Sequence, residues 1–309
     1  ATAMGRGTHR SVGHRVIPVR GVEAIGVTMP DYAIVAIGYE SQAEWDGFFE
    51  SVSRSTSQPK SIVVVDNSPQ PSLVASRWRS LPLSVLHTPE NPGYGAAANK
   101  GMAEVGDRVD WVVICNPDVR LFPATMEDLL SERTAFDQAA VLGPCVLTSE
   151  GSVYPSAREI PGLRIGVGHA LFSQIWPSNP WTARYLGTYS NEEPRSVGWL
   201  SGSFLLVNRE VFEKIGGFDE DFFMFFEDVD LGRRIKRAGY RNVYVPRAKV
   251  THSGAHATST RQKEMVLAHH HSAEKFLARL YPHAWQGILR VALRAGLRMR
   301  AWWESRNLD

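Results

Sequence analysis

The sequence predicts an α/β fold in which helices flank a mostly parallel sheet, with a helical appendage at the C-terminal end. Two observations predict this class. Short apolar runs typical of buried parallel strands alternate with segments of helical spacing, and polar residues follow the ends of several of these runs. The chain can also bury a sizeable core, because 43% of its 309 residues are hydrophobic.

The alternation begins at Tyr32. Residues 32–39 form an apolar, β-branched run that predicts a buried strand, and the next segment places Trp45, Phe48 and Val52 on one helical face. Later segments repeat the two patterns. Strands are expected within 61–68, 84–95, 110–121, 139–147 and 243–252, helices over 73–81, 96–105, 125–135 and 227–239, and a strand with a short helix within 198–223.

Bulk properties exclude some classes of function. The formal net charge is +2, which is too small to favour nucleic acid as a partner. Cys115 and Cys145 lie in apolar runs and are expected to be buried reduced thiols, a usage that favours the cytoplasm. No run of 18 apolar residues predicts a transmembrane helix. Residues 1–30 are expected to form a flexible tail, because they lack the apolar region of a signal peptide.

Four polar residues fall just past the carboxyl ends of expected strands: Tyr39, Asp66, Asn91 and Asp118. Ligands of open α/β sheets bind at that edge, so these side chains predict a binding site there. Asp66 could accept a hydrogen bond from the base or ribose of a nucleotide. A helix cap or an Asx-turn would explain the same residue equally well.

The loop 91–101 carries glycines at positions 93 and 95 directly before an expected helix. Backbone N–H groups and the dipole of that helix could hold a diphosphate, whereas an ordinary turn is the alternative. The spacing matches neither the dinucleotide-binding glycine pattern nor a P-loop. A dehydrogenase and a P-loop ATPase are therefore disfavoured.

Asn116, Pro117 and Asp118 form a degenerate acidic triplet at a strand end. A hard divalent cation needs few protein carboxylates when phosphate and water complete its shell. Asp118 is then expected to share the ion with His252, since Mn²⁺ accepts imidazole as well as oxygen. A structural histidine is the alternative, and His256 is the weaker candidate ligand.

Three acidic residues, Glu227, Asp228 and Asp230, follow the aromatic run 222–226 at the start of an expected helix. Carboxylates in a first helical turn are stabilised by the helix dipole, so a capping role is one interpretation. Because the preceding run is aromatic, Glu227 and Asp228 are expected to emerge from an apolar wall. A carboxylate there could take the proton of a substrate hydroxyl.

The C-terminal segment is basic and amphipathic. Arg290, Arg294 and Arg298 recur every four residues, and two tryptophans follow at 302 and 303. Such helices lie in the interface of anionic bilayers, while a core-packing or homodimer-forming helix is the alternative. The run His269–His271 is expected to be solvated or to face lipid.

In their order along the chain, these motifs resemble the family 2 glycosyltransferases, which have the GT-A fold. The resemblance covers residues 32–256 and implies a GT-A domain over 31–256, with 257–309 as a membrane-associating segment. It implies Asp228 as the catalytic base with Glu227 beside it, and Asp118 and His252 as ligands of Mn²⁺ or Mg²⁺. It also implies a donor site and an acceptor and sugar site. The implied donor residues are Tyr39, Asp66, Asn91, Gly95, Asn99 and Asn116, and the implied acceptor residues are Trp199, Ser201 and Gly202.

Segments such as VYPSAREIP, VGWLSGS and VYVPRAKVTH look like the rhamnosyltransferases that build the arabinogalactan linker. This closer resemblance implies dTDP-β-L-rhamnose as donor and polyprenyl-diphospho-GlcNAc as acceptor, with inversion giving an α-1,3 linkage. It implies work at the cytoplasmic face of the cell membrane. Asn116 departs from the pattern, because these relatives usually carry an acidic residue there. A relative that uses UDP-galactofuranose or GDP-mannose, and a non-catalytic sugar-nucleotide or lipid-binding scaffold, are the alternatives.

Overall fold

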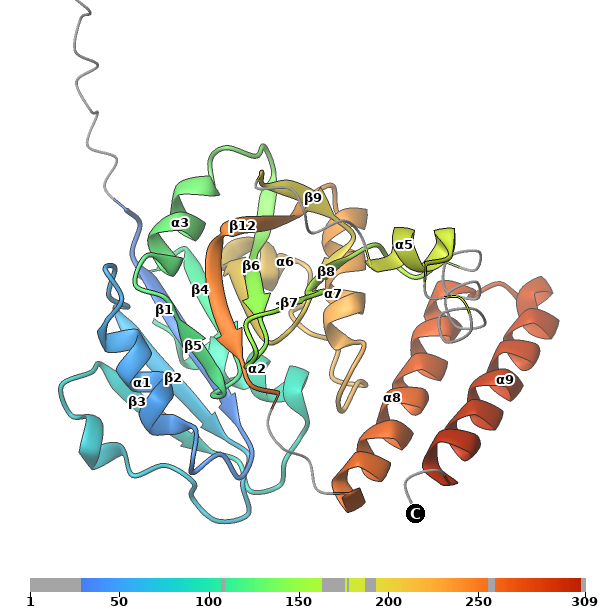
Figure 1. Cartoon of the computed structure of the whole chain (residues 1–309), viewed down its shortest axis with the longest axis horizontal. Helices are drawn as coiled ribbons and strands as arrows, with labels where there is room; N and C mark the ends of the chain where they lie inside the picture. Colours follow the sequence, from blue (N-terminus) through green and yellow to red (C-terminus); the bar gives the residue numbers. More distant parts are fainter. Residues whose placement is uncertain are drawn as a thin grey trace, which may run out of the picture.

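A computed structural model of the protein describes residues 29–106, 109–162, 176, 178–186, 193–254 and 259–306. A central sheet carries helices on both faces, and two long helices lie beside it at the C-terminal end (Figure 1). The α/β class predicted from the sequence is confirmed. The expected tail up to residue 28, the boundary after residue 256 and His256 itself lie outside the described residues.

The main sheet follows the order β3-β2-β1-β4-β11-β6-β12-β5, with β7 paired to β6 and β9 paired to β12. A separate small ribbon joins β8 and β10. The bounds of the strands are β1 (Tyr32–Gly38), β2 (Ser61–Asp66), β3 (Leu83–His87), β4 (Trp111–Cys115), β5 (Val119–Leu121), β6 (Ala139–Leu147), β7 (Val153–Tyr154), β8 (Ala157–Arg158), β9 (Arg195–Val197), β10 (Trp199–Leu200), β11 (Phe204–Asn208) and β12 (Arg241–His252).

Strands β1 to β4 are parallel. Strands β1, β2 and β4 are buried along nearly their whole length, as their apolar sequences predict, because both faces of such strands are covered. The edge strand β3 is partly exposed. Strand β11 enters between β4 and β6 and runs antiparallel to both. The short strand β5 pairs with the end of β12, where His252 lies opposite Val119. The ends of β4 and β12 meet at one edge of the sheet, where Asn116, directly after β4, contacts His252.

The helices divide between the two faces. Side chains of α1 and α3 share one apolar cluster with the sheet, and those of α2, α6 and α7 share the other. The helical bounds are α1 (Trp45–Ser53), η1 (Ala75–Trp78), α2 (Tyr94–Glu104), α3 (Thr125–Glu132), α5 (Pro180–Leu186), α6 (Arg209–Lys214), α7 (Glu227–Arg237), α8 (Ser259–Leu280), η2 (Ala284–Gln286) and α9 (Gly287–Arg306).

The helix predicted over 73–81 is wrong in extent. The segment forms only the four-residue 3-10 turn η1. Pro71 and Pro82 flank it, and a proline restricts the residue before it to extended backbone. The prediction for the cysteines is confirmed, since Cys115 and Cys145 are both free and buried.

Helices α8 and α9 form an antiparallel pair, drawn in orange and red in Figure 1. Arg294 and Arg298 of α9 both form ion pairs with Glu274 of α8. Helix α8 also packs against the core, because Phe276 is buried together with Trp199, Phe222 and Val229. The expectation of a solvated histidine run is wrong for His270, which is buried.

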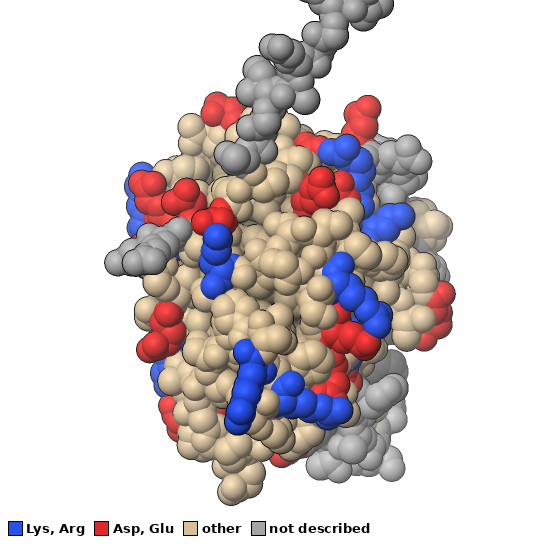
Figure 2. Space-filling view, turned by 90° about the vertical axis from the view of Figure 1, so that its left-hand side faces the viewer, with Lys and Arg blue, Asp and Glu red and all other residues tan. Residues whose placement is uncertain are grey.

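The surface carries both signs of charge. On the side of α1 and η1, basic and acidic side chains are interspersed (Figure 2), and exposed ion pairs such as Arg77–Asp46 and Arg54–Glu50 account for part of this pattern. A mixed surface of this kind does not attract a polyanion. Within the described ranges, every helix is too short or too polar to cross a bilayer.

Candidate active site

Asp228 lies in the first turn of α7, facing the turn that joins β10 to β11. Its Oδ2 accepts a hydrogen bond from the backbone N–H of Gly202 at 2.9 Å, and its Oδ1 accepts one from Val229 N–H at 2.8 Å. Burial raises the pKa of the Asp228 carboxyl, while the N–H donors of Gly202 and Val229 and the charge of Arg158 oppose this rise. A carboxylate with a raised pKa is a stronger base.

Glu227, the neighbouring carboxyl, is 6% exposed, and its Oε2 has no hydrogen-bond partner among the described residues. Burial, and then the negative charge of Asp228, raise the pKa of Glu227 well above its usual value. Asp228 accepts two N–H donors, which favour its ionised form, whereas Glu227 Oε2 accepts none among the described residues. This hydrogen bonding favours Asp228 as the member of the pair that ionises first.

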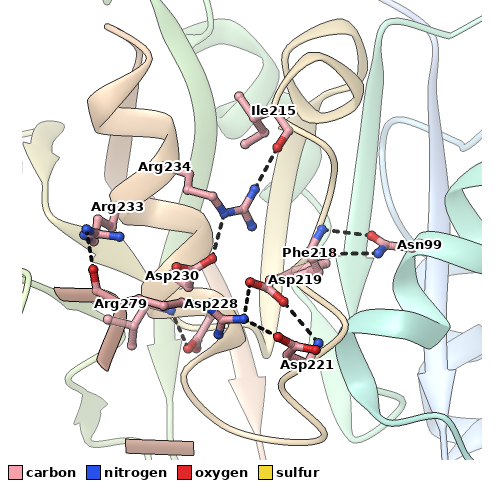
Figure 3. A network of polar contacts seen from close by, with 11 residues as sticks. Asn99, Ile215, Phe218, Asp219, Asp221, Asp228, Asp230, Arg233, Arg234 and Arg279 are labelled. Atoms are coloured by element: carbon pink, nitrogen blue, oxygen red, sulfur yellow. Dashed lines mark hydrogen bonds and ion pairs between the residues drawn. The ribbon is translucent and has the colours of Figure 1, made fainter. Parts of the chain in front are cut away.

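The third acidic residue of α7 has a structural role. Asp230 is 1% exposed and forms an ion pair with Arg234 at 2.6 Å, and Arg234 also donates to the carbonyl of Ile215 (Figure 3). Both partners lie on the same helix one turn apart. This contact occupies the Asp230 carboxylate and links α7 to Ile215.

Tyr94, which the sequence analysis did not single out, lies at the first position of α2. Its hydroxyl donates to the carbonyl of Gly202 at 2.5 Å. Burial raises the pKa of Tyr94 far above its usual value, and negative charge on its neighbours adds to the effect. These neighbours are Cys115, Glu227, Asp228 and Asp118, so the Tyr94 hydroxyl lies within electrostatic range of both the acidic pair and the predicted metal ligand.

Asp118 and His252 meet at the end of the β5–β12 pair. The His252 Nε2 lies 3.2 Å from Asp118 Oδ1 and 3.2 Å from Asn116 Nδ2. The Asp118 side chain is 5% exposed and that of His252 is 21% exposed, so the pair opens to solvent on the imidazole side. Asp118 and His252, which the sequence predicts to share an ion, thus lie in contact, and Asn116 lies beside them.

One carboxylate and one imidazole suit a borderline divalent ion, provided that a diphosphate and water complete its shell. Within the described ranges, no group of three or more acidic, cysteine or histidine side chains is placed to hold a metal by itself. The donor set therefore fits an ion that arrives with its substrate.

Two predicted donor residues already use their side chains within the protein. Asp66 is buried, and its carboxylate accepts from Ser68 N–H at 3.1 Å and from Ser72 N–H at 2.5 Å. This is the Asx-turn alternative that the sequence left open. Asn99 pairs through its amide with both backbone groups of Phe218, at 2.9 Å each.

The remaining predicted donor residues line the entry to α2 and the end of β1. Tyr39 is 44% exposed, Asn91 adopts a left-handed backbone, and Gly95 is buried against Phe218. Gly93 has φ 95°, and a side chain there would collide with the backbone of Phe223. Only glycine fits this approach of two backbones.

The predicted acceptor segment surrounds Asp228. Gly202 binds it through the N–H described above, and the hydroxyl of Ser201 lies 3.2 Å from that of Ser203. Trp199 is 7% exposed, and its indole N–H donates to Glu159 O at 3.1 Å. The indole packs in the apolar cluster that also contains Phe222, Val229 and Phe276, so the Trp199 side chain has a packing role in this segment.

Residues 60–267 match the model of the family described as Glycosyltransferase like family 2. The chain belongs to glycosyltransferase family 2. It is 40% identical over 280 residues to the N-acetylglucosaminyl-diphospho-decaprenol L-rhamnosyltransferase of Mycobacterium tuberculosis, an alignment that covers 87% of this chain and 91% of the relative. The resemblance drawn from the motifs is thereby confirmed.

Solved structures share the fold of this family 2 chain. One is GalNAc-T7 with UDP, GalNAc and Mn²⁺, at a TM-score of 0.53 and 14% identity over 78% of this chain and 48% of that one. Another is the mannosyltransferase PcManGT of Pyrobaculum calidifontis with GDP-Man and Mn²⁺. Its TM-score is 0.51 and its sequence identity is 18%, over 81% of this chain and 65% of that one. Both are GT-A glycosyltransferases, which confirms the predicted GT-A fold. Both neighbours were solved with a divalent metal ion.

Proposed function

We propose that this protein is an inverting rhamnosyltransferase. It moves L-rhamnose from dTDP-β-L-rhamnose to the 3-hydroxyl of GlcNAc in a polyprenyl-diphospho-GlcNAc acceptor. The observation that carries the proposal is the 40% identity to the mycobacterial rhamnosyltransferase over 87% of the chain. The name of that relative gives both the transferred sugar and the acceptor class. The buried pair of carboxyl residues, Glu227 and Asp228, lies beside the predicted acceptor segment and supports the same reaction.

Asp228 acts as the general base. The N–H bonds from Gly202 and Val229 orient its carboxylate, and its raised pKa makes it a better proton acceptor near neutral pH. The acceptor hydroxyl gives its proton to Asp228 as it attacks the anomeric carbon on the face opposite the diphosphate. Because a single displacement inverts that carbon, the reaction needs no nucleophile from the protein.

Asp118 and His252 would hold a divalent ion, Mn²⁺ or Mg²⁺, on the diphosphate of the donor. Such an ion supplies positive charge to the leaving group as the glycosidic bond breaks. The 3.2 Å approach of His252 to Asp118, at a partly open position, supports this assignment. Asn116 donates no charge, but its amide lies 3.2 Å from the same imidazole and would orient it.

A lipid-linked acceptor requires contact with a membrane surface, and α9 supports that contact. Its outward face carries an exposed apolar row, named here the α9 stripe: Ile288, Val291, Met299 and Trp302, which are 87%, 68%, 69% and 57% exposed. These positions recur at helical spacing on one face. Apolar stripes on basic helices lie in the interface of bilayers. The cytoplasmic face of the cell membrane remains the expected location.

Transfer assays with a polyprenyl-diphospho-GlcNAc analogue and a panel of nucleotide sugars test the proposal. The panel contains dTDP-rhamnose, UDP-galactofuranose, GDP-mannose and UDP-glucose. We expect rhamnose transfer, with product linkage and anomeric configuration read by NMR. A preference for another donor would replace the proposed sugar. Binding of a nucleotide sugar without transfer from any donor of the panel would instead support a scaffold without its own catalysis.

A further inference from the structure

The turn 219–226 delivers the Glu227–Asp228 pair to the site, and it has no regular secondary structure of its own. Phe225 and Phe226, directly before the pair, both adopt left-handed backbone with φ 66°. Bulky side chains rarely occupy that region, and they do so only where surrounding contacts hold them. The geometry of Asp228 therefore depends on the groups that fix this turn.

One face of α8 supplies three polar contacts to the turn. Ser272 donates to Met224 O at 2.7 Å, and Lys275 donates to Asp221 O. Arg279 forms ion pairs with Asp219 and Asp221 at 2.7 Å each (Figure 3). The three donors recur at spacings of three and four, so they all project toward the same neighbour.

Aromatic contacts reinforce the polar ones. The guanidinium of Arg279 lies over the ring of Phe222 at 4.5 Å from its centroid. Phe276, which is 1% exposed, packs against Phe226 with ring centroids 5.4 Å apart. His269 contacts the rings of Phe225 and Phe226 at 5.4 and 5.2 Å. Both left-handed residues are thus held by α8.

The opposite side of the turn is held by α2. The N–H of Tyr94 donates to Phe223 O at 2.9 Å, and Asn99 pairs with Phe218. Helix α7 is tied to α8 directly, because Arg233 donates to Arg279 O at 3.3 Å. The turn 219–226 is therefore held between α2 and α8. The residues of α8 that contact it all lie beyond residue 267, where the family match ends.

We propose that Arg279, with Lys275 and Ser272, is a positioning residue for the transfer reaction: α8 holds turn 219–226 so that Asp228 meets the acceptor hydroxyl. This inference rests on the proposed function for the identity of the reaction. It assigns to the C-terminal hairpin, the pair of helices α8 and α9, a part in catalysis as well as in membrane contact. Small displacements of a base cost rate because the transition state needs aligned groups.

Arg279→Met keeps an unbranched apolar stem and removes the guanidinium. We expect kcat to fall about 10- to 100-fold, as misplacement of a reacting group does. The Kd of dTDP with Mn²⁺, measured by calorimetry, should stay within about twofold of wild type, because the donor side is held by other elements. Hydrogen exchange should accelerate in residues 219–230 and stay unchanged in the β1–β4 region.

Arg279→Lys, which retains the charge, should recover part of kcat. The matched control is Arg247→Met, which removes an exposed arginine paired with Glu132 on the far side of β12. It should behave as wild type in all three measurements. If Arg279→Met folds poorly, Lys275→Met and Ser272→Ala provide the same test with smaller losses.

Wild-type kcat in Arg279→Met would overturn the inference. A parallel loss of kcat, dTDP affinity and global exchange protection would also overturn it, because α8 would then support the whole fold and not the turn. If wild type transfers no rhamnose, the proposed function fails by itself. Hydrogen exchange in Arg279→Met still tests the positioning role in that case. Acceleration confined to residues 219–230 supports the contact of α8 with the turn as the group that holds it, and unchanged exchange there refutes this role.

Discussion

The carboxylate of Asp228 and the backbone N–H of Gly202 are 2.9 Å apart, although the two residues are 26 positions apart in the chain. This bond joins the start of α7 to the turn between β10 and β11. It orients one lone pair of the carboxylate and opposes the rise of its pKa that burial causes.

Asp228→Asn removes the proton acceptor and preserves the shape of the side chain. We expect kcat to fall by about 10²- to 10⁴-fold, the usual contribution of a general base. Binding of dTDP with Mn²⁺ should be retained, which calorimetry checks. Asp137→Asn, at an exposed position before β6, is the control and should keep wild-type kcat. Retained transfer in Asp228→Asn would exclude Asp228 as the base.

Tyr94→Phe removes the hydroxyl that fixes the Gly202 carbonyl. A neutral hydrogen bond contributes about 1 kcal/mol, so kcat should fall about fivefold. Since the Gly202 N–H lowers the pKa of Asp228, a looser Gly202 should raise that pKa. The acidic limb of the kcat profile should therefore move to higher pH. Tyr240→Phe is the control, and an unshifted limb in Tyr94→Phe would contradict the prediction.

Glu227→Gln tests the neutral state of Glu227. Its pKa is raised by burial, so the folded protein binds more protons than the unfolded chain between the unfolded value, about 4.3, and the folded one. The free energy of unfolding of wild type should accordingly fall as pH rises through that window. In Glu227→Gln, urea titrations should show a flatter dependence. An equally steep fall in the variant would assign the effect to another group.

The kinetic profile of Glu227→Gln provides a separate check. If Glu227 is already neutral when Asp228 ionises, the variant should keep its acidic limb near the wild-type position and retain most of kcat. A limb displaced to lower pH would mean that Glu227 carries charge in the working enzyme.

Removal of the metal ligands should change the metal requirement. EDTA is expected to abolish transfer, and His252→Ala should raise the Mn²⁺ concentration for half-maximal rate about tenfold or more. The exposed His283→Ala is the control. Activity of wild type in EDTA would show that Asp118 and His252 serve another purpose.

The α9 stripe should govern binding to vesicles that contain anionic lipid. Full burial of an isoleucine-sized side chain is worth about 1.5–3 kcal/mol, so Ile288→Asp should weaken vesicle binding about tenfold or more. Co-sedimentation with vesicles measures it. Val74→Asp changes another exposed apolar residue, away from α9, and should bind as wild type does.

Much of the fold was predictable because its strands are short apolar runs with local signals. The pair Asp118 and His252 was also predictable, since Asp118 lies between β4 and β5, His252 ends β12, and the motif order supplied their neighbourhood. Tyr94 was missed because its partner, Gly202, lies 108 positions away, and periodicity carries no information on such contacts. Asn99 had a functional interpretation, yet its amide already binds the backbone of Phe218.

The C-terminal segment shows the same limit. Its helices were expected from amphipathic spacing, but the contacts of α8 with turn 219–226 were not. Ser272 and Met224 are 48 positions apart, and neither belongs to a recognisable motif. Its histidine run looked solvated because of its basic surroundings, whereas tertiary packing buries His270.

The contacts between α8 and the Asp219–Phe226 turn also constrain protein engineering. A chimera that moves the α8–α9 pair of this chain onto a relative would separate Arg279 from Asp219 and Asp221. Such a graft would have to transplant the turn together with the hairpin. The two segments, separated in sequence by α7 and β12, constitute a single exchangeable unit.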